Sequence, residues 1–144
     1  MPILAGQVVT AQQLTRLQPV SYNAAGSGTI AASSTNADVT GATITLTTET
    51  ANAVYKAWCV WDFNTTAAPG ASSTARMALD SVGQSPVATF RGDNSAERGT
   101  VAQVYRGTLP SAGSHTFKLI ATTATNTECL GANCSITVEI NEVV

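Results

Sequence analysis

The longest alternation of apolar and polar residues in the chain runs from Ala53 to Phe63. Its odd positions are all apolar, whereas its even positions are mixed and include Trp58 and Val60. A period of two predicts a β-strand with one face in a hydrophobic core. At ~3.3 Å per residue, this strand would cross a whole small domain. Trp58 and Val60 lie on the face away from that core, and a partner subunit is one candidate to cover them.

Seven further segments have the pattern of strands and are separated by turn-forming residues. They are Thr29–Ala32, Val39–Leu46, Ala75–Asp80, Val87–Arg91, Thr100–Leu109, Thr116–Ala121 and Ser135–Asn141. Eight strands without alternating helices predict an all-β protein, an antiparallel β-sandwich or barrel. Some of the strands are long enough to cross the domain, and the Cys…Trp…Cys spacing of immunoglobulin domains is absent. We therefore expect a jelly-roll-like antiparallel β-sandwich.

The first residues have a different pattern, which predicts a short helix. Thr10–Gln13 matches a capping box, and Val9 and Leu14 occupy the positions of a hydrophobic staple. Leu14 and Leu17 share a helical face, and Pro19 ends the helix. A helix of about two turns is too short to be stable alone. It either packs on its own domain or anchors the chain to another protein.

These patterns divide the chain into three parts. Residues 1–22 form an N-terminal arm with the short helix, and residues 35–144 form the sandwich. Residues 23–34 between them are mostly small, as in the run Asn23–Gly28, and predict a flexible linker.

The composition narrows the choice of partners. Charged residues make up 11% of the chain, against roughly a quarter in ordinary globular proteins, and the formal net charge is −2. Such a surface has little electrostatic reach, so nucleic acid and anionic membrane are poor partners. The start of the chain lacks the pattern of a signal peptide, and no segment has the length of an apolar membrane span.

The cysteines allow two interpretations. Cys59 lies on the predicted core face and reads as a buried thiol. Cys129 and Cys134 flank a turn-forming tetrapeptide and would close a small loop if oxidised. A chain made in a reducing compartment would keep them as thiols, so both states stay open.

No pattern of catalytic residues is present. The sole histidine, His115, follows a turn, and no Gly-x-Ser-x-Gly motif marks a nucleophile. Asp62 reads as a turn cap at the end of its strand. The spacing of His115, Cys129 and Cys134 matches no zinc motif, and no glycine-rich phosphate loop occurs. We therefore predict no catalytic residue, no cofactor and no metal site.

Several segments resemble small virion structural proteins of tailed bacteriophages, especially those of actinobacterial hosts. The opening AGQVVTAQQL is similar to their start, "AGQ-x-hydrophobic-T-A-x-x-L". The similarity continues through Ala37–Leu46, Trp61–Phe63, Arg106–Leu109 and Ala112–Leu119. The resemblance implies an N-terminal anchor before a β-sandwich, often trimeric, displayed on the capsid or tail. The Cys129–Cys134 loop departs from this pattern.

The expected function is therefore that of a non-enzymatic capsid decoration or head-fibre protein, located in the virion and assembled in the host cytoplasm. Val9, Leu14 and Leu17 would anchor it to the major capsid protein or another virion protein. Trp58 and Val60 would form the interface of a homotrimer. The alternative is a minor tail or tail-fibre protein that binds a host surface glycan.

For that alternative, an exposed aromatic side chain beside polar groups is the feature to look for, because sugar sites usually need one. Tyr105 and the loops at 64–73 and 91–99 are the candidates.

Overall fold

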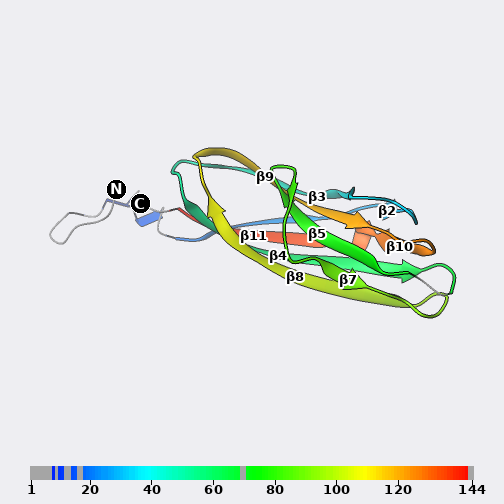
Figure 1. Cartoon of the computed structure of the whole chain (residues 1–144). Helices are drawn as coiled ribbons and strands as arrows, with labels where there is room; N and C mark the ends of the chain where they lie inside the picture. Colours follow the sequence, from blue (N-terminus) through cyan, green and yellow to red (C-terminus); the bar gives the residue numbers. More distant parts are fainter. Residues whose placement is uncertain (1–7, 9, 12–13, 16–17, 69–70, 143–144) are drawn as a thin grey trace.

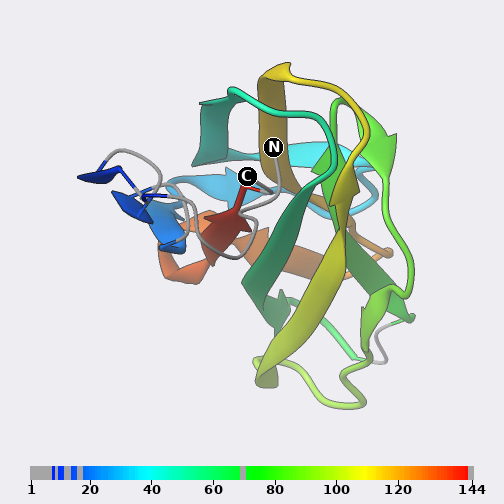
Figure 2. The same cartoon turned by 90° about the vertical axis from the view of Figure 1, so that its left-hand side faces the viewer.

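The computed structural model describes residues 8, 10–11, 14–15, 18–68 and 71–142. Figure 1 shows their arrangement: long strands run side by side in two layers, and Figure 2 shows the layers from one end. The strands are β1 (Val20–Ala25), β2 (Thr29–Ile30), β3 (Ala37–Thr48), β4 (Ala53–Thr65), β5 (Ser73–Leu79), β6 (Val82–Gly83), β7 (Ala88–Phe90), β8 (Arg98–Leu109), β9 (Gly113–Thr122), β10 (Thr127–Leu130) and β11 (Ser135–Asn141). A single 3₁₀ turn, η1 (Gly131–Asn133), separates β10 from β11.

The two sheets have the strand order of a jelly roll. In the first sheet β4 pairs with β8 on one side and with β10 and β11 on the other, and these two pair in turn with β2 and β1. In the second sheet the order is β3, β9, β5, with β6 and β7 both paired to the far side of β5. Every pairing is antiparallel. The predicted jelly-roll-like sandwich is confirmed.

The core lies between the sheets, and the odd face of β4 forms its centre. The residues of that face, Ala53, Tyr55, Ala57, Cys59, Trp61 and Phe63, are all buried. Tyr55 meets Phe117 of the second sheet edge to face, with ring centroids 5.2 Å apart. Phe63 stacks on Phe90 at 5.5 Å. The period-two prediction for this strand is therefore confirmed, because large side chains of both sheets interdigitate on this face.

The predicted linker at 23–34 is wrong. β1 starts at Val20 and pairs with β11 along its whole length, and β2 at Thr29 pairs with β10. The small residues between these strands serve close packing: a Cβ on Gly26 would collide with the backbone carbonyl of Gly131. The sandwich therefore begins at β1, fifteen positions before the predicted boundary at residue 35.

The predicted N-terminal helix falls partly on described residues. Ala11, Leu14 and Thr15 are helical. The Leu14 N–H donates to the Thr10 carbonyl at 3.1 Å, as expected for a helical turn that begins at this threonine. Val9 and Leu17, the other two predicted anchoring residues, lie outside the described residues.

Candidate interaction surfaces

The described residues before β1 carry exposed apolar side chains. Val8 is 89% exposed and Leu14 is 54% exposed, and Val20 at the start of β1 is half exposed. Side chains with this exposure contribute little to the stability of the sandwich through burial. Their apolar surface is available to a partner.

A hollow of about 160 Å³ lies beside this segment, at the end of the sandwich where β1 begins. It is lined by Thr15, Gln18, Val20, Tyr22, Leu46, Thr47, Glu49, Ile140 and Glu142. The Glu142 carboxylate accepts hydrogen bonds from the backbone N–H groups of Glu49 at 3.1 Å and Thr50 at 3.2 Å. These bonds fix the turn after β3 to the residue after β11, so the wall of the hollow is well defined.

The outer face of the first sheet carries the predicted interface residues. Trp58 and Val60 are half buried there, and the exposed Val104 lies opposite Trp58 on β8. The Lys56 ammonium lies 4.3 Å from the Trp58 ring centroid, a cation–π contact. The position of these side chains away from the core agrees with the alternation of β4. Their role in an oligomer stays a prediction.

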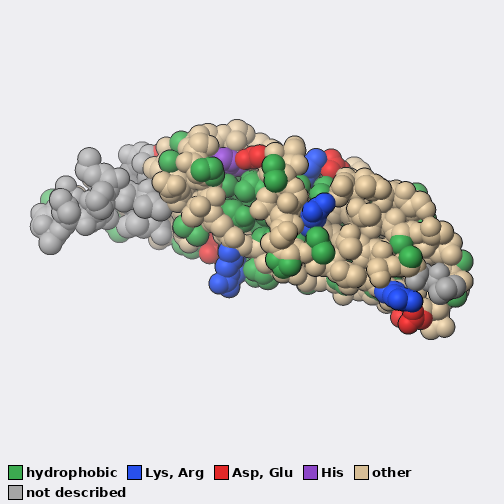
Figure 3. Space-filling view, viewed as in Figure 1, with side chains coloured by type: hydrophobic (Ala, Val, Ile, Leu, Met, Phe, Trp, Pro, Cys, Tyr) green, Lys and Arg blue, Asp and Glu red, His purple; other side chains and the backbone are tan. Residues whose placement is uncertain are grey.

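The outer face of the second sheet has a polar hollow of about 170 Å³. In it, Lys118 donates to the Asp38 carboxylate at 2.9 Å, and Arg76 donates to the Asn36 side-chain oxygen at 3.1 Å. Its described lining contains no aromatic side chain. Figure 3 shows that charged side chains are few on the visible face, which consists mostly of uncharged residues.

Tyr105 does not present a sugar-stacking surface, and that expectation is wrong. Its side chain faces inward, the residue is only 3% exposed, and its hydroxyl donates to the Pro86 carbonyl at 2.8 Å. Burial raises the pKa of Tyr105 to about 12. The strand alternation places this residue on the core face of β8, opposite Ala57.

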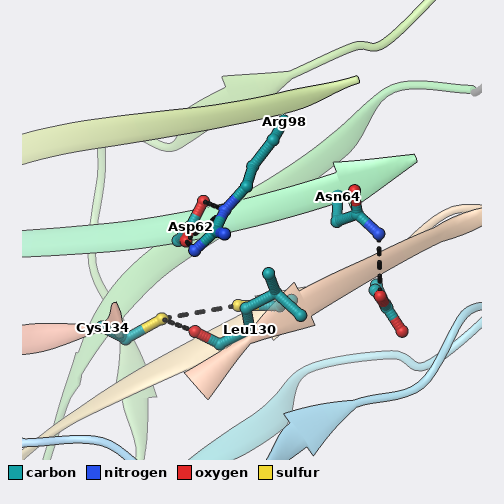
Figure 4. Close-up of polar contacts among 7 residues, drawn as sticks. Asp62, Asn64, Arg98, Leu130 and Cys134 are labelled. Carbon is teal, nitrogen blue, oxygen red and sulfur yellow. Dashed lines mark hydrogen bonds and ion pairs between the residues drawn. The ribbon is translucent and has the colours of Figure 1, made fainter. Parts of the chain in front are cut away.

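Asp62 forms an ion pair with Arg98 and does not cap a turn. Its side chain is 3% exposed within β4 and accepts hydrogen bonds from the Arg98 guanidinium, with Nε 2.9 Å from Oδ2. Figure 4 shows Arg98 lying over the carboxylate from the neighbouring strand. The hydrogen bonds with Asp62 raise the pKa of Arg98. The pair lets a carboxylate be buried on the outer face of a sheet.

The two cysteines of the turn are thiols in this structure. The Sγ atoms of Cys129 and Cys134 lie 3.7 Å apart, both side chains are buried, and the Cys134 thiol lies 3.5 Å from the Leu130 carbonyl (Figure 4). The hydrogen bond between the two sulfur atoms lowers the pKa of Cys134 and raises that of Cys129. Cys59 is a third buried thiol, and burial raises its pKa to about 12.

His115 follows a turn, as its sequence position indicates, but its side chain is buried. Its Nδ1 lies 2.8 Å from the Asp80 carboxylate, and its Nε2 lies 3.0 Å from the Ser111 carbonyl. A histidine that acts as a general base needs one ring nitrogen directed at the group it deprotonates. Both nitrogens here are occupied by acceptors of the same chain, so the geometry gives this histidine a structural role.

Two kinds of feature are absent from the part of the chain that the structure describes. No three histidine, cysteine or acidic side chains of the described residues are grouped so that they could hold a metal ion. No described helix has the length and apolar character needed to cross a membrane.

Comparisons with known proteins give distant structural similarity but no family. No family model matches the chain, and no curated protein matches it. Among solved structures, the chain is similar to one described as "EclA C-terminal domain; sugar-binding protein", with 14% sequence identity and a TM-score of 0.36. The match covers 96% of this chain and 81% of the other.

Proposed function

We propose that the chain is a non-enzymatic virion structural protein, a capsid decoration or head-fibre protein of a tailed bacteriophage. In this proposal the segment before β1 attaches the chain to the major capsid protein or another virion protein, and the jelly roll is displayed outside. The homotrimer expected from the sequence stays a prediction.

The observation that carries the proposal is the exposure of Val8 and Leu14 in the segment before β1. A single helical turn has no intrinsic stability in water, and its large apolar side chains are not buried by the described sandwich. A segment of this kind gains stability when its apolar residues are buried by a partner. The resemblance to phage virion proteins at AGQVVTAQQL supports the same interpretation.

The experiment is to remove residues 1–18 and to measure whether the truncated chain is incorporated into virions. Because β1 begins at Val20, we expect the truncated sandwich to keep its far-ultraviolet spectrum and a cooperative unfolding transition. We expect it to be absent from purified particles. Incorporation at the level of the full chain would overturn the assignment of the anchor.

A matched pair of substitutions separates burial from charge. Leu14→Asp places a carboxylate on an apolar position of the helical turn, whereas Gln18→Asp adds the same charge at an exposed polar position near its end. Incorporation should fall strongly for Leu14→Asp and stay near the full level for Gln18→Asp. Equal loss for both would indicate an electrostatic effect and not an apolar anchor.

The second candidate function is a minor tail or tail-fibre protein that binds a host surface glycan. The observation in its favour is the polar hollow on the second sheet, where Asn36, Asp38, Arg76 and Lys118 offer several donors and acceptors within one site. A glycan array with the purified chain tests it. Binding that is lost in Arg76→Ala would favour this function, and silence across the array would favour decoration.

A further inference from the structure

The two sheets have four edges, and three of them carry features that block pairing with another strand. Natural β-proteins protect edges with short strands, bulges, prolines and charges. In the second sheet, one edge consists of β6 and β7, with two and three residues. The other edge is β3, whose register shifts between Asp38 and Thr43, with Gly41 in a left-handed conformation at φ 83°.

The β1–β2 edge of the first sheet is also interrupted. The chain leaves the sheet at Gly26 and returns at Thr29, and β2 has only two residues. The connection is turned toward the sandwich, because the Ser27 N–H donates to the Thr40 carbonyl of β3 at 2.7 Å. A second chain therefore finds no continuous row of backbone groups along this edge.

The β8 edge is long and has no bulge. β8 has 12 residues, and each of them pairs with β4 in one unbroken register. It contains no proline, and its charged side chains are limited to Arg98 and Arg106. Among the described strands, β4 is its sole partner in the sheet. Figure 1 shows β8 following nearly the whole length of the sandwich along its margin.

Contacts from the second sheet leave most of this edge open. Phe90 of β7 lies close to Gly99, at the first end of β8. Beyond that point the inward residues are half buried, except for the buried Tyr105 and Leu109, and the outward residues are exposed. Val104 is 41% exposed although it lies in the middle of the strand. In an antiparallel strand, alternate residues direct their N–H and C=O groups away from the paired neighbour. These groups of β8 therefore form a row that faces no neighbouring strand. Within it, the Val104 carbonyl accepts a hydrogen bond from the Gln103 side chain at 3.4 Å, which pairing with another strand would have to replace.

We propose that β8 pairs antiparallel with β8 of a second copy of this chain and joins the two first sheets into one. The occupant is a second copy because an antiparallel strand is complementary to itself under a two-fold axis, which closes the assembly. A pairing over this length would form about 10 backbone hydrogen bonds, the number typical of a stable protein interface. Trp58 and Val104 would then lie on one outer face that continues across the axis.

The two arginines select the register of this pairing. If the axis passed at Ala102, Arg98, whose charge is partly offset by Asp62, would lie opposite Arg106 of the second copy. Like charges placed directly opposite are destabilising. With the axis at Gln103, Arg98 lies opposite Thr108 and Arg106 opposite Thr100. We assign the register centred on Gln103. This two-fold dimer differs from the trimer expected through Trp58 and Val60, and it does not depend on attachment to a virion.

The test measures the mass of the full chain by sedimentation and native mass spectrometry over a range of concentrations. The double variant Ala102→Lys and Val104→Lys places lysine opposite lysine twice in the assigned register, at positions that are exposed in one chain. The matched control, Thr43→Lys and Thr45→Lys, adds the same charge at the same spacing on exposed positions of β3. We expect a dimer whose Kd rises at least ~10-fold in the β8 variant, a change of about 1.4 kcal/mol, and stays unchanged in the control.

Amide hydrogen exchange gives a second readout that does not need a variant. Every second amide of β8 should become protected as the concentration rises, because only alternate N–H groups face the second copy. The proposal would be overturned if the chain stayed monomeric at a protein concentration about 100 times a Kd of one micromolar. A dimer weakened equally by both double variants, or a trimer that Trp58→Lys dissociates and the β8 variant does not, would also overturn it.

Discussion

The imidazole of His115 is held between two acceptors, the Asp80 carboxylate at 2.8 Å from Nδ1 and the Ser111 carbonyl at 3.0 Å from Nε2. Neutral imidazole has one N–H donor, whereas the imidazolium has two. Both contacts are therefore satisfied only when the ring is protonated. The hydrogen bond with Asp80 raises the pKa of His115, more than burial lowers it.

This relationship predicts a stability that depends on pH. Because the folded pKa of His115 is raised, its stabilisation is complete below the unfolded value of about 6.5 and is lost as the pH rises through the folded value. Burial raises the pKa of Asp80, but its hydrogen bonds from Thr116 and His115 give a net lowering. Its stabilisation is complete above about 3.9 and is lost as the pH falls through the folded value. The pair should therefore stabilise the fold most between about pH 4 and 6.5.

Urea unfolding of the wild type and of His115→Gln, measured from pH 5 to 9, tests this. The wild type should lose free energy of unfolding across this range. Because His115 is the sole histidine of the chain, His115→Gln should be less stable at pH 5.5 and nearly independent of pH. A slope of equal size in the variant would contradict the assignment.

Gly107 lies where even one added methyl group should lower the free energy of unfolding, because the Tyr55 ring packs against it. A Cβ at Gly107 would lie 2.8 Å from the Cε1 atom of the Tyr55 ring, which packs over this glycine from the neighbouring strand. Gly107→Ala would push the ring against Phe117 and overpack the core. We expect a loss of about 1–3 kcal/mol in the free energy of unfolding.

The adjacent residue supplies the control. Thr108 is exposed on the outer face of β8, so Thr108→Ala should change the free energy of unfolding by less than about 0.5 kcal/mol. Urea unfolding of both variants measures the difference. Similar values for the two would show that the Tyr55 ring moves aside at little cost.

Much of this fold follows from alternation, because strands buried on one face show it directly. Ser135–Asn141 was predicted with the observed bounds, and Ala53–Phe63 with the observed core face. β1 was missed since its inward residues, such as Tyr22 and Ala24, are only half buried and its neighbours are small. A run of alanines and glycines shows no alternation of apolar and polar residues, although close packing requires such small residues at these positions.

The interaction surfaces were harder to predict for a different reason. An edge strand and an interior strand have the same alternation, so the sequence of β8 does not reveal that one side lacks a partner. Likewise, the sequence separates Asp62 from Arg98, and Asp80 from His115, by more than thirty positions. Only the register of the strands brings each acid to its base.

Cys129 and Cys134 lie close enough in the structure that we expect oxidation to close their loop with a disulfide. With their sulfur atoms 3.7 Å apart, a change of side-chain torsion brings them to bonding distance. Equilibration with oxidised glutathione should form the disulfide, as two thiols give two electrons and two protons to the glutathione disulfide. The chain-entropy model gives at most about 2 kcal/mol for so short a loop.

Mass spectrometry after alkylation and a thermal melt measure this outcome. The oxidised wild type should unfold at a higher temperature, whereas Cys134→Ala treated in the same way should show no increase. A wild-type chain that keeps both thiols under these conditions would show that the buried geometry resists the bond.

The two tryptophans of β4 give the sharpest test of its two faces. Trp61 is completely buried, and its indole N–H has no hydrogen-bond partner among the described residues, whereas Trp58 is half buried beneath Lys56. In Trp58→Phe, the remaining Trp61 fluorescence should be blue-shifted and resist acrylamide quenching. In Trp61→Phe, the remaining Trp58 should be red-shifted and readily quenched, because one side of its ring faces the outer surface.

The same asymmetry should appear in stability. Trp61→Ala opens a cavity between the sheets and should cost about 3–5 kcal/mol, whereas Trp58→Lys keeps the core of β4 intact and should leave the chain folded. A lower subunit number in a folded Trp58→Lys variant would support the predicted interface on this face. If Trp58→Lys unfolds the chain as Trp61→Ala does, the outer face contributes to the stability of the single sandwich, and the interface loses its support from the sequence.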